Sequence, residues 1–116
     1  MVWRYASEFS AEAERDFGLI LDHLFESYQG FGEPMEAAMR HAGQRVMEIR
    51  RAAGRLETAP HRGTSRDDLL SGLRFLALDG AVLWFEVDDD NRKVRVLAVF
   101  FGGQDHIRHM LVRLLR

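Results

Sequence analysis

Two histidines near the end of the chain, His106 and His109, have the side-chain chemistry and the spacing to act together. Residues three apart on a helix share a face, and an imidazole pair there can bind a metal ion or transfer protons near neutral pH. The nearest carboxylate in the sequence is Asp105, which leaves a metal ion short of ligands. We therefore expect no metal site and interpret the pair as part of a solvated helix face.

Three other residues have side chains that suit contacts with RNA or with a carboxylate. His61 and Arg62 lie in a segment without periodicity, and because loops often hold functional residues, both are weak candidates for RNA contact. Arg74 follows Gly72-Leu73 at the start of an apolar run. Its charge is costly to bury unpaired, so we expect a structural role in which it anchors a strand against a carboxylate. No clear catalytic motif accompanies these residues, and we expect no cofactor.

Helical periodicity dominates the first half of the chain. Aromatic residues near alternate positions predict a strand over residues 2–9, and Ser10 then has the chemistry of a helix N-cap. Pro34 suits the first position of a second helix, and Pro60 prevents its continuation. The predicted buried stripes are Phe17, Ile20, Leu24 and Tyr28 in the first helix, and Met35, Met39, Ala42, Val46, Ile49, Ala53 and Leu56 in the second. We expect the two helices to pack as an antiparallel hairpin.

Strand patterns dominate the second half, after a predicted connection over residues 58–72. Three apolar runs follow, at residues 73–78, 81–87 and 93–101. Asp79-Gly80 between the first two is typical of a two-residue hairpin, so the runs predict an antiparallel meander. We expect Trp84 and Phe85 to pack in the core or beneath a bound partner protein. Asp105 has the chemistry to cap a short C-terminal helix. The apolar side of that helix is expected to comprise Ile107, Met110, Leu111 and Leu114.

Composition restricts the classes of function. The 116 residues suit one domain, which we expect to span 1–116, and the absence of cysteine excludes disulfides and thiolate metal sites. The net charge is −2, with acids concentrated in residues 1–36 and bases in 40–66 and 92–116. Tight nucleic-acid binding needs a strong basic excess, so we expect no extensive contact with RNA or DNA.

The N-terminus lacks a signal peptide and no apolar run could span a bilayer, which predicts a cytoplasmic protein without membrane contact.

The order of the predicted elements and three short segments resemble a known family. The segments are Leu56…Pro60-His61-Arg62-Gly63, Gly72-Leu73-Arg74 and Val99-Phe100-Phe101-Gly102-Gly103-Gln104-Asp105. Together with the order strand, helical hairpin, three-stranded meander and C-terminal helix, they resemble the RelE/ParE superfamily of bacterial type II toxins. The resemblance implies an α+β toxin domain that is neutralised by a cognate antitoxin whose amphipathic segment wraps the toxin.

The superfamily has two functional branches, which the terminal residues help to separate. RelE-like members cleave mRNA on the ribosome without a metal, which needs a base, an acid and cations for the developing charge. Those members have arginine and lysine after the glycine that follows the last strand, and a tyrosine in the terminal segment. Here the corresponding sequence is Gly103-Gln104-Asp105-His106, and residues 107–116 contain no tyrosine. The chain therefore resembles ParE more closely, and ParE-like members poison DNA gyrase by binding, without catalysis of their own.

This resemblance implies a ParD-like antitoxin bound through an amphipathic helix or an extended segment, DNA gyrase as the target, and no catalytic residues. The candidate target-binding residues are Gln104, Asp105, His106, Arg108, His109, Arg113 and Arg116. Two alternatives stay open. In one, His106, His109 and nearby arginines replace the usual set of a ribosome-dependent mRNA endoribonuclease. In the other, the chain is a non-toxic interaction module with the same fold.

Overall fold

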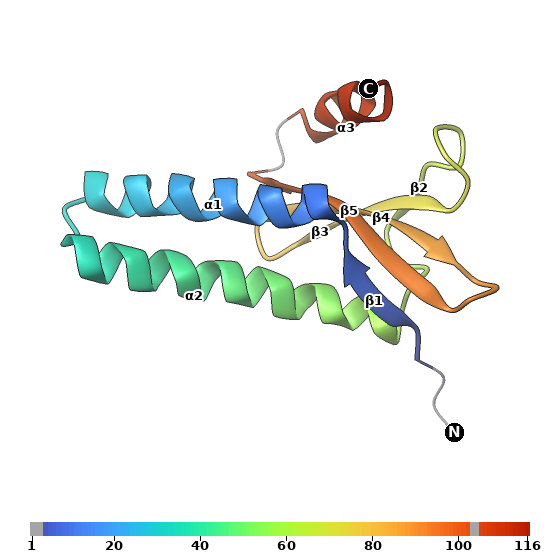
Figure 1. Ribbon diagram of the computed structural model, residues 1–116, viewed down its shortest axis with the longest axis horizontal. Coiled ribbons are helices and arrows are strands. Elements are labelled where there is room, and N and C mark those ends of the chain that lie inside the picture. Colours follow the sequence, from blue (N-terminus) through green and yellow to red (C-terminus); the bar gives the residue numbers. More distant parts are fainter. Residues whose placement is uncertain (1–3, 103–104) are drawn as a thin grey trace.

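The computed structural model describes residues 4–102 and 105–116, so Gln104 lies outside the described residues. The elements follow one another as predicted from the sequence, with two short additions (Figure 1). In chain order they are β1 (Ala6–Phe9), α1 (Ala11–Gly30), α2 (Met35–Ala53), the 3-10 helix η1 (Gly54–Glu57), β2 (Thr64–Ser65), β3 (Leu73–Leu78), β4 (Ala81–Asp88), β5 (Lys93–Phe101) and α3 (His106–Leu114). Within the described residues the first strand begins at Ala6, later than predicted, and residues 2 and 3 of the predicted strand lie outside the described residues. Pro34 is the N-cap of α2 where we had expected its first residue.

A mixed sheet of five strands, in the order β1-β5-β4-β3-β2, forms the centre of the molecule. The predicted antiparallel meander of β3, β4 and β5 is confirmed, with the hairpin at Asp79-Gly80. Two pairings were not predicted. β1 runs parallel to β5, with Ala6 opposite Lys93, and β2 lies within the predicted connection and pairs with β3. A strand of two residues is too short to show an alternating pattern, so the sequence could not indicate β2.

The helical hairpin covers one face of the sheet. The Ser10 hydroxyl accepts a hydrogen bond from the Ala13 N–H at 3.1 Å, which confirms the predicted cap of α1. Residues from both helices, such as Ile20 and Ile49, pack with Leu83 and Phe85 of β4 in one cluster. Figure 1 shows that the hairpin extends well beyond the sheet. There it has no sheet to pack against.

The exposed end of the hairpin corrects one prediction. Met35 and Met39 belong to the predicted buried stripe of α2, yet they are 66% and 44% exposed. Met47, on another side of the helix, is 51% exposed. The stripe is buried only from Ala42 onward, where α2 lies over the sheet, because helical periodicity indicates which side faces inward but not where the partner surface ends.

The second face of the sheet packs against α3. Leu73, Val82, Trp84 and Ala98 form a separate cluster with Met110 of α3. Because side chains alternate between the faces of a strand, Trp84 lies in this cluster and Phe85 in the other, and both are fully buried as predicted. β5 therefore has apolar residues on both faces, with Val96 in the first cluster and Ala98 in the second. No helix in the described part of the chain is long and apolar enough to cross a membrane.

Candidate functional site

The candidate target-binding residues lie on or next to α3, and the buried side of this helix differs from the predicted one. Four residues at helical spacing point inward or are partly covered, namely His106, Met110, Arg113 and Leu114. Ile107 and Leu111, which were expected on the buried side, are exposed at 39% and 36%. The reason is that two polar contacts with the rest of the molecule draw His106 and Arg113 inward.

The first of these contacts joins His106 to the sheet. The indole Nε1 of Trp84 donates a hydrogen bond to Nδ1 of His106 at 3.1 Å. The imidazole also lies 4.9 Å from the ring centroid of Phe75 and 5.6 Å from that of Trp84. Burial lowers the pKa of His106 below its ordinary value. The predicted solvated face is therefore wrong for His106, because its ring lies against aromatic side chains.

His109, one turn further along α3, stays exposed. Its ring centroid lies 5.7 Å from that of Phe100, at the edge of a groove described below. The two histidines thus have different surroundings despite their spacing of three residues. Within the described ranges, no group of three or more His, Asp or Glu residues is placed to hold a metal ion.

The second contact joins Arg113 of α3 to Asp16 of α1. The guanidinium nitrogens Nη1 and Nη2 each donate to one carboxylate oxygen of Asp16 at 2.8 Å, and the main-chain N–H of Val99 donates to the same carboxylate at 2.9 Å. Arg113 also lies 3.0 Å from a carboxylate oxygen of Glu12. Hydrogen bonding to Asp16 raises the pKa of Arg113 above its ordinary range. Arg113 therefore has a role inside the molecule, which the sequence did not indicate.

Asp16 was missed as a site residue, although the sequence contained a signal. It is 5% exposed and is a buried charged residue on α1. It lies next to Phe17 and four residues before Ile20, so helical spacing places it on the apolar side of α1. A carboxylate in such a position needs a cation or several hydrogen-bond donors. The sequence could not show which of the many arginines supplies the cation.

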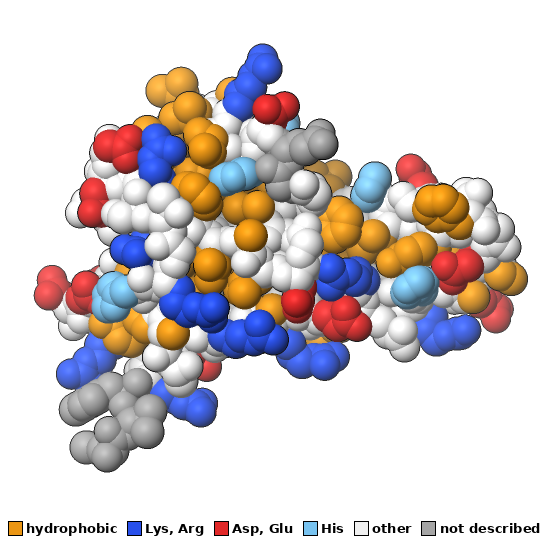
Figure 2. All heavy atoms as spheres, turned by 180° about the vertical axis from the view of Figure 1, so that it is seen from behind, with side chains coloured by type: hydrophobic (Ala, Val, Ile, Leu, Met, Phe, Trp, Pro, Cys, Tyr) orange, Lys and Arg blue, Asp and Glu red, His pale blue; other side chains and the backbone are white. Residues whose placement is uncertain are grey.

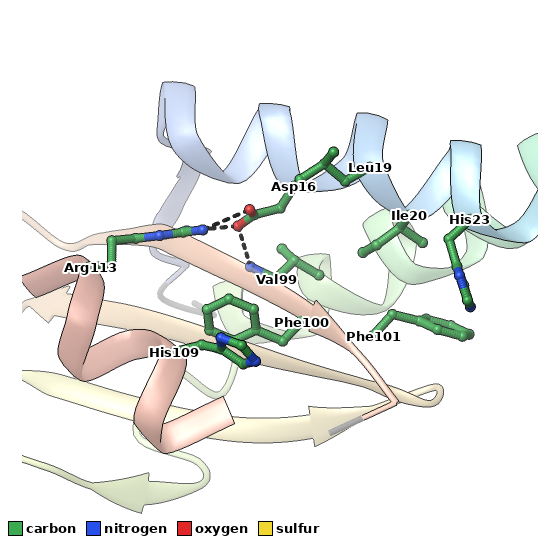
Figure 3. Close-up of a pocket in the computed structure, with 9 residues that line it drawn as sticks. All are labelled: Asp16, Leu19, Ile20, His23, Val99, Phe100, Phe101, His109 and Arg113. Atoms are coloured by element: carbon green, nitrogen blue, oxygen red, sulfur yellow. Dashed lines mark hydrogen bonds and ion pairs between the residues drawn. The ribbon is translucent and has the colours of Figure 1, made fainter. Parts of the chain in front are cut away.

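A groove opens beside this ion pair, between α1, the end of β5 and α3 (Figure 3). Its volume is about 320 Å³, and its lining residues are Asp16, Leu19, Ile20, His23, Val99, Phe100, Phe101, His109 and Arg113. Figure 3 shows His23 beside Phe101 and His109 beside Phe100, on opposite sides of the groove. The apolar floor can take an apolar side chain of a partner, and the polar residues at its edge can orient that partner.

The remaining candidates of α3 lie on its outer surface. Arg108 is exposed, as is Asp105, which occupies the N-cap position with a left-handed φ of 55° but makes no side-chain capping hydrogen bond. Arg116 is exposed and lies 3.7 Å from Glu12. Figure 2 shows hydrophobic side chains beside basic ones on this part of the molecule. The exposed apolar residues of the terminal segment are Ile107, Leu111, Val112 and Leu115.

The loop candidates form a separate group. His61 Nε2 lies 2.7 Å from Oδ1 of Asp89, to which the Tyr5 hydroxyl also donates a hydrogen bond at 2.6 Å. These two bonds lower the pKa of Asp89, and the Asp89 contact raises the pKa of Tyr5. The structure thus joins His61 to the turn between β4 and β5. Among the described residues it brings His61 into no hydrogen bond with the candidates on α3.

Arg74 binds main-chain oxygens where we had expected a carboxylate. Its Nε donates to the carbonyl of Arg62 at 2.9 Å, and its Nη2 donates to the carbonyl of Gly63 at 3.1 Å. These bonds connect β3 to the loop that precedes β2. The side chain of Arg62 itself is exposed.

Comparison with known proteins places this geometry in a fold family. No family model matches the sequence, and no curated protein matches it. Among solved structures, a chain from the chromosomal ParDE TA system of P. aeruginosa superposes with a TM-score of 0.62 and 18% identity, covering 84% of this chain and 95% of that chain. The chain has the RelE/ParE fold. The RelBE2 toxin–antitoxin complex from Mycobacterium tuberculosis gives a TM-score of 0.50 and 21% identity, with 84% and 98% of the two chains covered.

The RelE/ParE fold confirms the fold class predicted from the sequence. The TM-score is higher for the ParDE chain than for the RelBE2 chain. At these identities the likeness is one of fold, and the functional residues must be judged from this chain alone.

Proposed function

We propose that residues 1–116 form the toxin of a bacterial type II toxin–antitoxin system, which binds and inhibits DNA gyrase in the cytoplasm as ParE-like toxins do. The observation on which this proposal rests is that two basic side chains of the terminal segment already have partners inside the molecule. Arg113 is held by Asp16 and Glu12, and His106 accepts a hydrogen bond from Trp84. An endoribonuclease needs a base, an acid and cations placed together around the scissile phosphate. Side chains already held by internal partners are poorly suited to these roles.

The proposed toxin is neutralised by a ParD-like antitoxin. The groove between α1, β5 and α3 offers an apolar floor with an exposed Leu19 at its edge. An amphipathic helix can place apolar residues in such a groove at intervals of three or four residues, and a segment that is disordered alone can then extend over neighbouring surface. The mixed charge of the exposed residues around α3 suits contacts with a protein better than contacts with a nucleic acid.

Gyrase supercoiling measured with purified protein tests the proposal. We expect loss of supercoiling or accumulation of cleaved DNA as the protein is added. Arg108→Glu is expected to weaken this effect, because Arg108 is an exposed cation of α3. Thr58→Glu serves as the matched control and should leave inhibition unchanged. Thr58 is exposed and lies at the C-cap of η1. Normal supercoiling at saturating concentrations of folded protein would reject the proposal.

The two alternatives give different outcomes. Mapping of mRNA ends after induction without an antitoxin detects cuts at defined codon positions if the protein is a ribosome-dependent endoribonuclease, and His109→Ala should then abolish them. Unimpaired growth with soluble, folded protein present would favour a non-toxic interaction module. Blocked DNA replication with intact transcripts is the result that the proposed function requires.

A further inference from the structure

The two polar contacts that hold α3 differ in how they respond to protonation. The contact at its C-terminal end is the Arg113–Asp16 ion pair, which contains no imidazole. The contact at its N-terminal end is the hydrogen bond from Trp84 to His106. An indole N–H can only donate, so Nδ1 of His106 must be the acceptor. This bond therefore exists only while the imidazole is neutral, with its proton on Nε2.

The surroundings of His106 also disfavour a positive charge. Phe75 of β3 and Trp84 of β4 lie against its ring, and no described acidic residue lies within ion-pair distance. Further along the strands, Glu86 of β4 lies opposite Arg95 of β5, and Arg95 lies 3.7 Å from a carboxylate oxygen of Glu8 in β1. On α3 itself the nearby groups are Asp105, Arg108 and His109. His106 is also the first residue of α3, where the helix dipole disfavours a cation.

We propose that α3 is a pH-sensitive flap, whose N-terminal end is released from the sheet when His106 is protonated. Protonation places a hydrogen on Nδ1, which then faces the hydrogen of the Trp84 indole and breaks the bond. The apolar cluster of Leu73, Trp84 and Met110 becomes accessible, while the Arg113–Asp16 pair still tethers the other end of α3. This inference does not depend on the proposed toxin function.

The direction of the pH dependence follows from the burial of His106. Its pKa is lower in the docked state than the ordinary value of about 6.5, which it regains when α3 is released. Docking is therefore fully favourable above about pH 6.5 and weakens as the pH falls below this value. The ratio of docked to released α3 falls by up to about tenfold for each pH unit until the docked imidazole is itself protonated.

The test uses the full chain with Trp3→Phe, which leaves Trp84 as its remaining tryptophan. Hydrogen exchange of the α3 amides and the NMR signal of the Trp84 indole N–H are followed between pH 7.5 and 5.5. We expect exchange within α3 to accelerate by up to about tenfold relative to α1 over one pH unit, and the indole signal to shift with the titration of His106.

Two variants separate the flap from general acid effects. His106→Asn keeps an acceptor near the position of Nδ1 but does not titrate, so α3 protection should become independent of pH in this range. His109→Asn removes the exposed histidine of the same helix and should keep the wild-type pH dependence. Persistence of the pH dependence in His106→Asn would overturn the inference. So would a wild-type Trp84 indole signal that stays constant while His106 titrates, and this measurement needs no variant to fold.

Discussion

Replacement of Arg113 by methionine removes the cation that neutralises a buried carboxylate. Asp16 is 5% exposed, and its two oxygens accept from the Arg113 guanidinium and from the Val99 N–H. In Arg113→Met the Val99 bond remains, while the carboxylate loses both charge-assisted bonds. Methionine has a similar length, so the change tests the charge more than the packing over Phe100, whose ring lies 5.2 Å from the guanidinium carbon.

The size of the effect follows from the burial of the pair. Removal of one partner of a buried ion pair typically costs about 3–5 kcal/mol, because an uncompensated charge is left behind. The retained hydrogen bond from Val99 and the partial exposure of Arg113 place our expectation at the lower end, about 3 kcal/mol. For a chain of this length, that loss lowers the melting temperature by about 12 °C.

Urea unfolding and calorimetry at neutral pH measure this loss directly, and a second change makes the test sharper. Asp16→Asn added to Arg113→Met should recover much of the stability, because no buried charge remains and the amide oxygen still accepts from Val99. Arg116→Met is the matched control: this arginine is exposed and lies 3.7 Å from Glu12, so we expect a change within about 0.5 kcal/mol. A loss below 1 kcal/mol in Arg113→Met, or a double variant less stable than the single one, would contradict the reasoning.

Three further predictions concern a helix cap and two glycines. Ser10→Ala should lower the free energy of unfolding by about 1 kcal/mol, because the Ala13 N–H loses its capping partner, and urea titration would detect it. Gly63→Ala should cost more than about 2 kcal/mol, since Gly63 has a φ of +83° and an added Cβ would lie 2.2 Å from the Phe75 carbonyl oxygen. Gly18→Ala should instead stabilise α1 by about 0.5–1 kcal/mol, because a Cβ added there meets nothing within 4 Å. Equal melting temperatures for the two glycine variants would count against this account.

The elements of the fold could be predicted because their signals are local. Ser10, Asp79-Gly80 and the apolar spacing of α1 each determine structure within a few residues. The parallel pairing of β1 with β5 joins segments more than 80 residues apart, and no local pattern specifies such a partner. The same limit explains the exposed Met35 and Met39, since the sequence does not show where the sheet ends beneath a long helix.

In the candidate site, the sequence likewise indicated which side chains are chemically capable but not which residues they contact. Sequence reasoning selected Arg113 and His106 as chemically capable residues, and both do form specific polar contacts. Their partners are Asp16, 97 residues away, and Trp84, 22 residues away. The local spacing of residues indicates neither pairing. For a cation or an imidazole, the partner inside the molecule therefore affects the functional interpretation more than the position on the helix does.

This internal pairing determines which parts of the terminal segment can meet another molecule. With His106 and Arg113 directed toward the protein, the outer surface of α3 combines exposed arginines with an apolar row at helical spacing. Apolar residues next to cations suit the burial of a protein surface with complementary acids, because apolar contact supplies affinity and charge supplies orientation. A phosphate backbone would use only the cations and would leave Ile107, Leu111 and Val112 in water. The composition of this surface therefore favours a protein over a nucleic acid as the molecule that α3 meets.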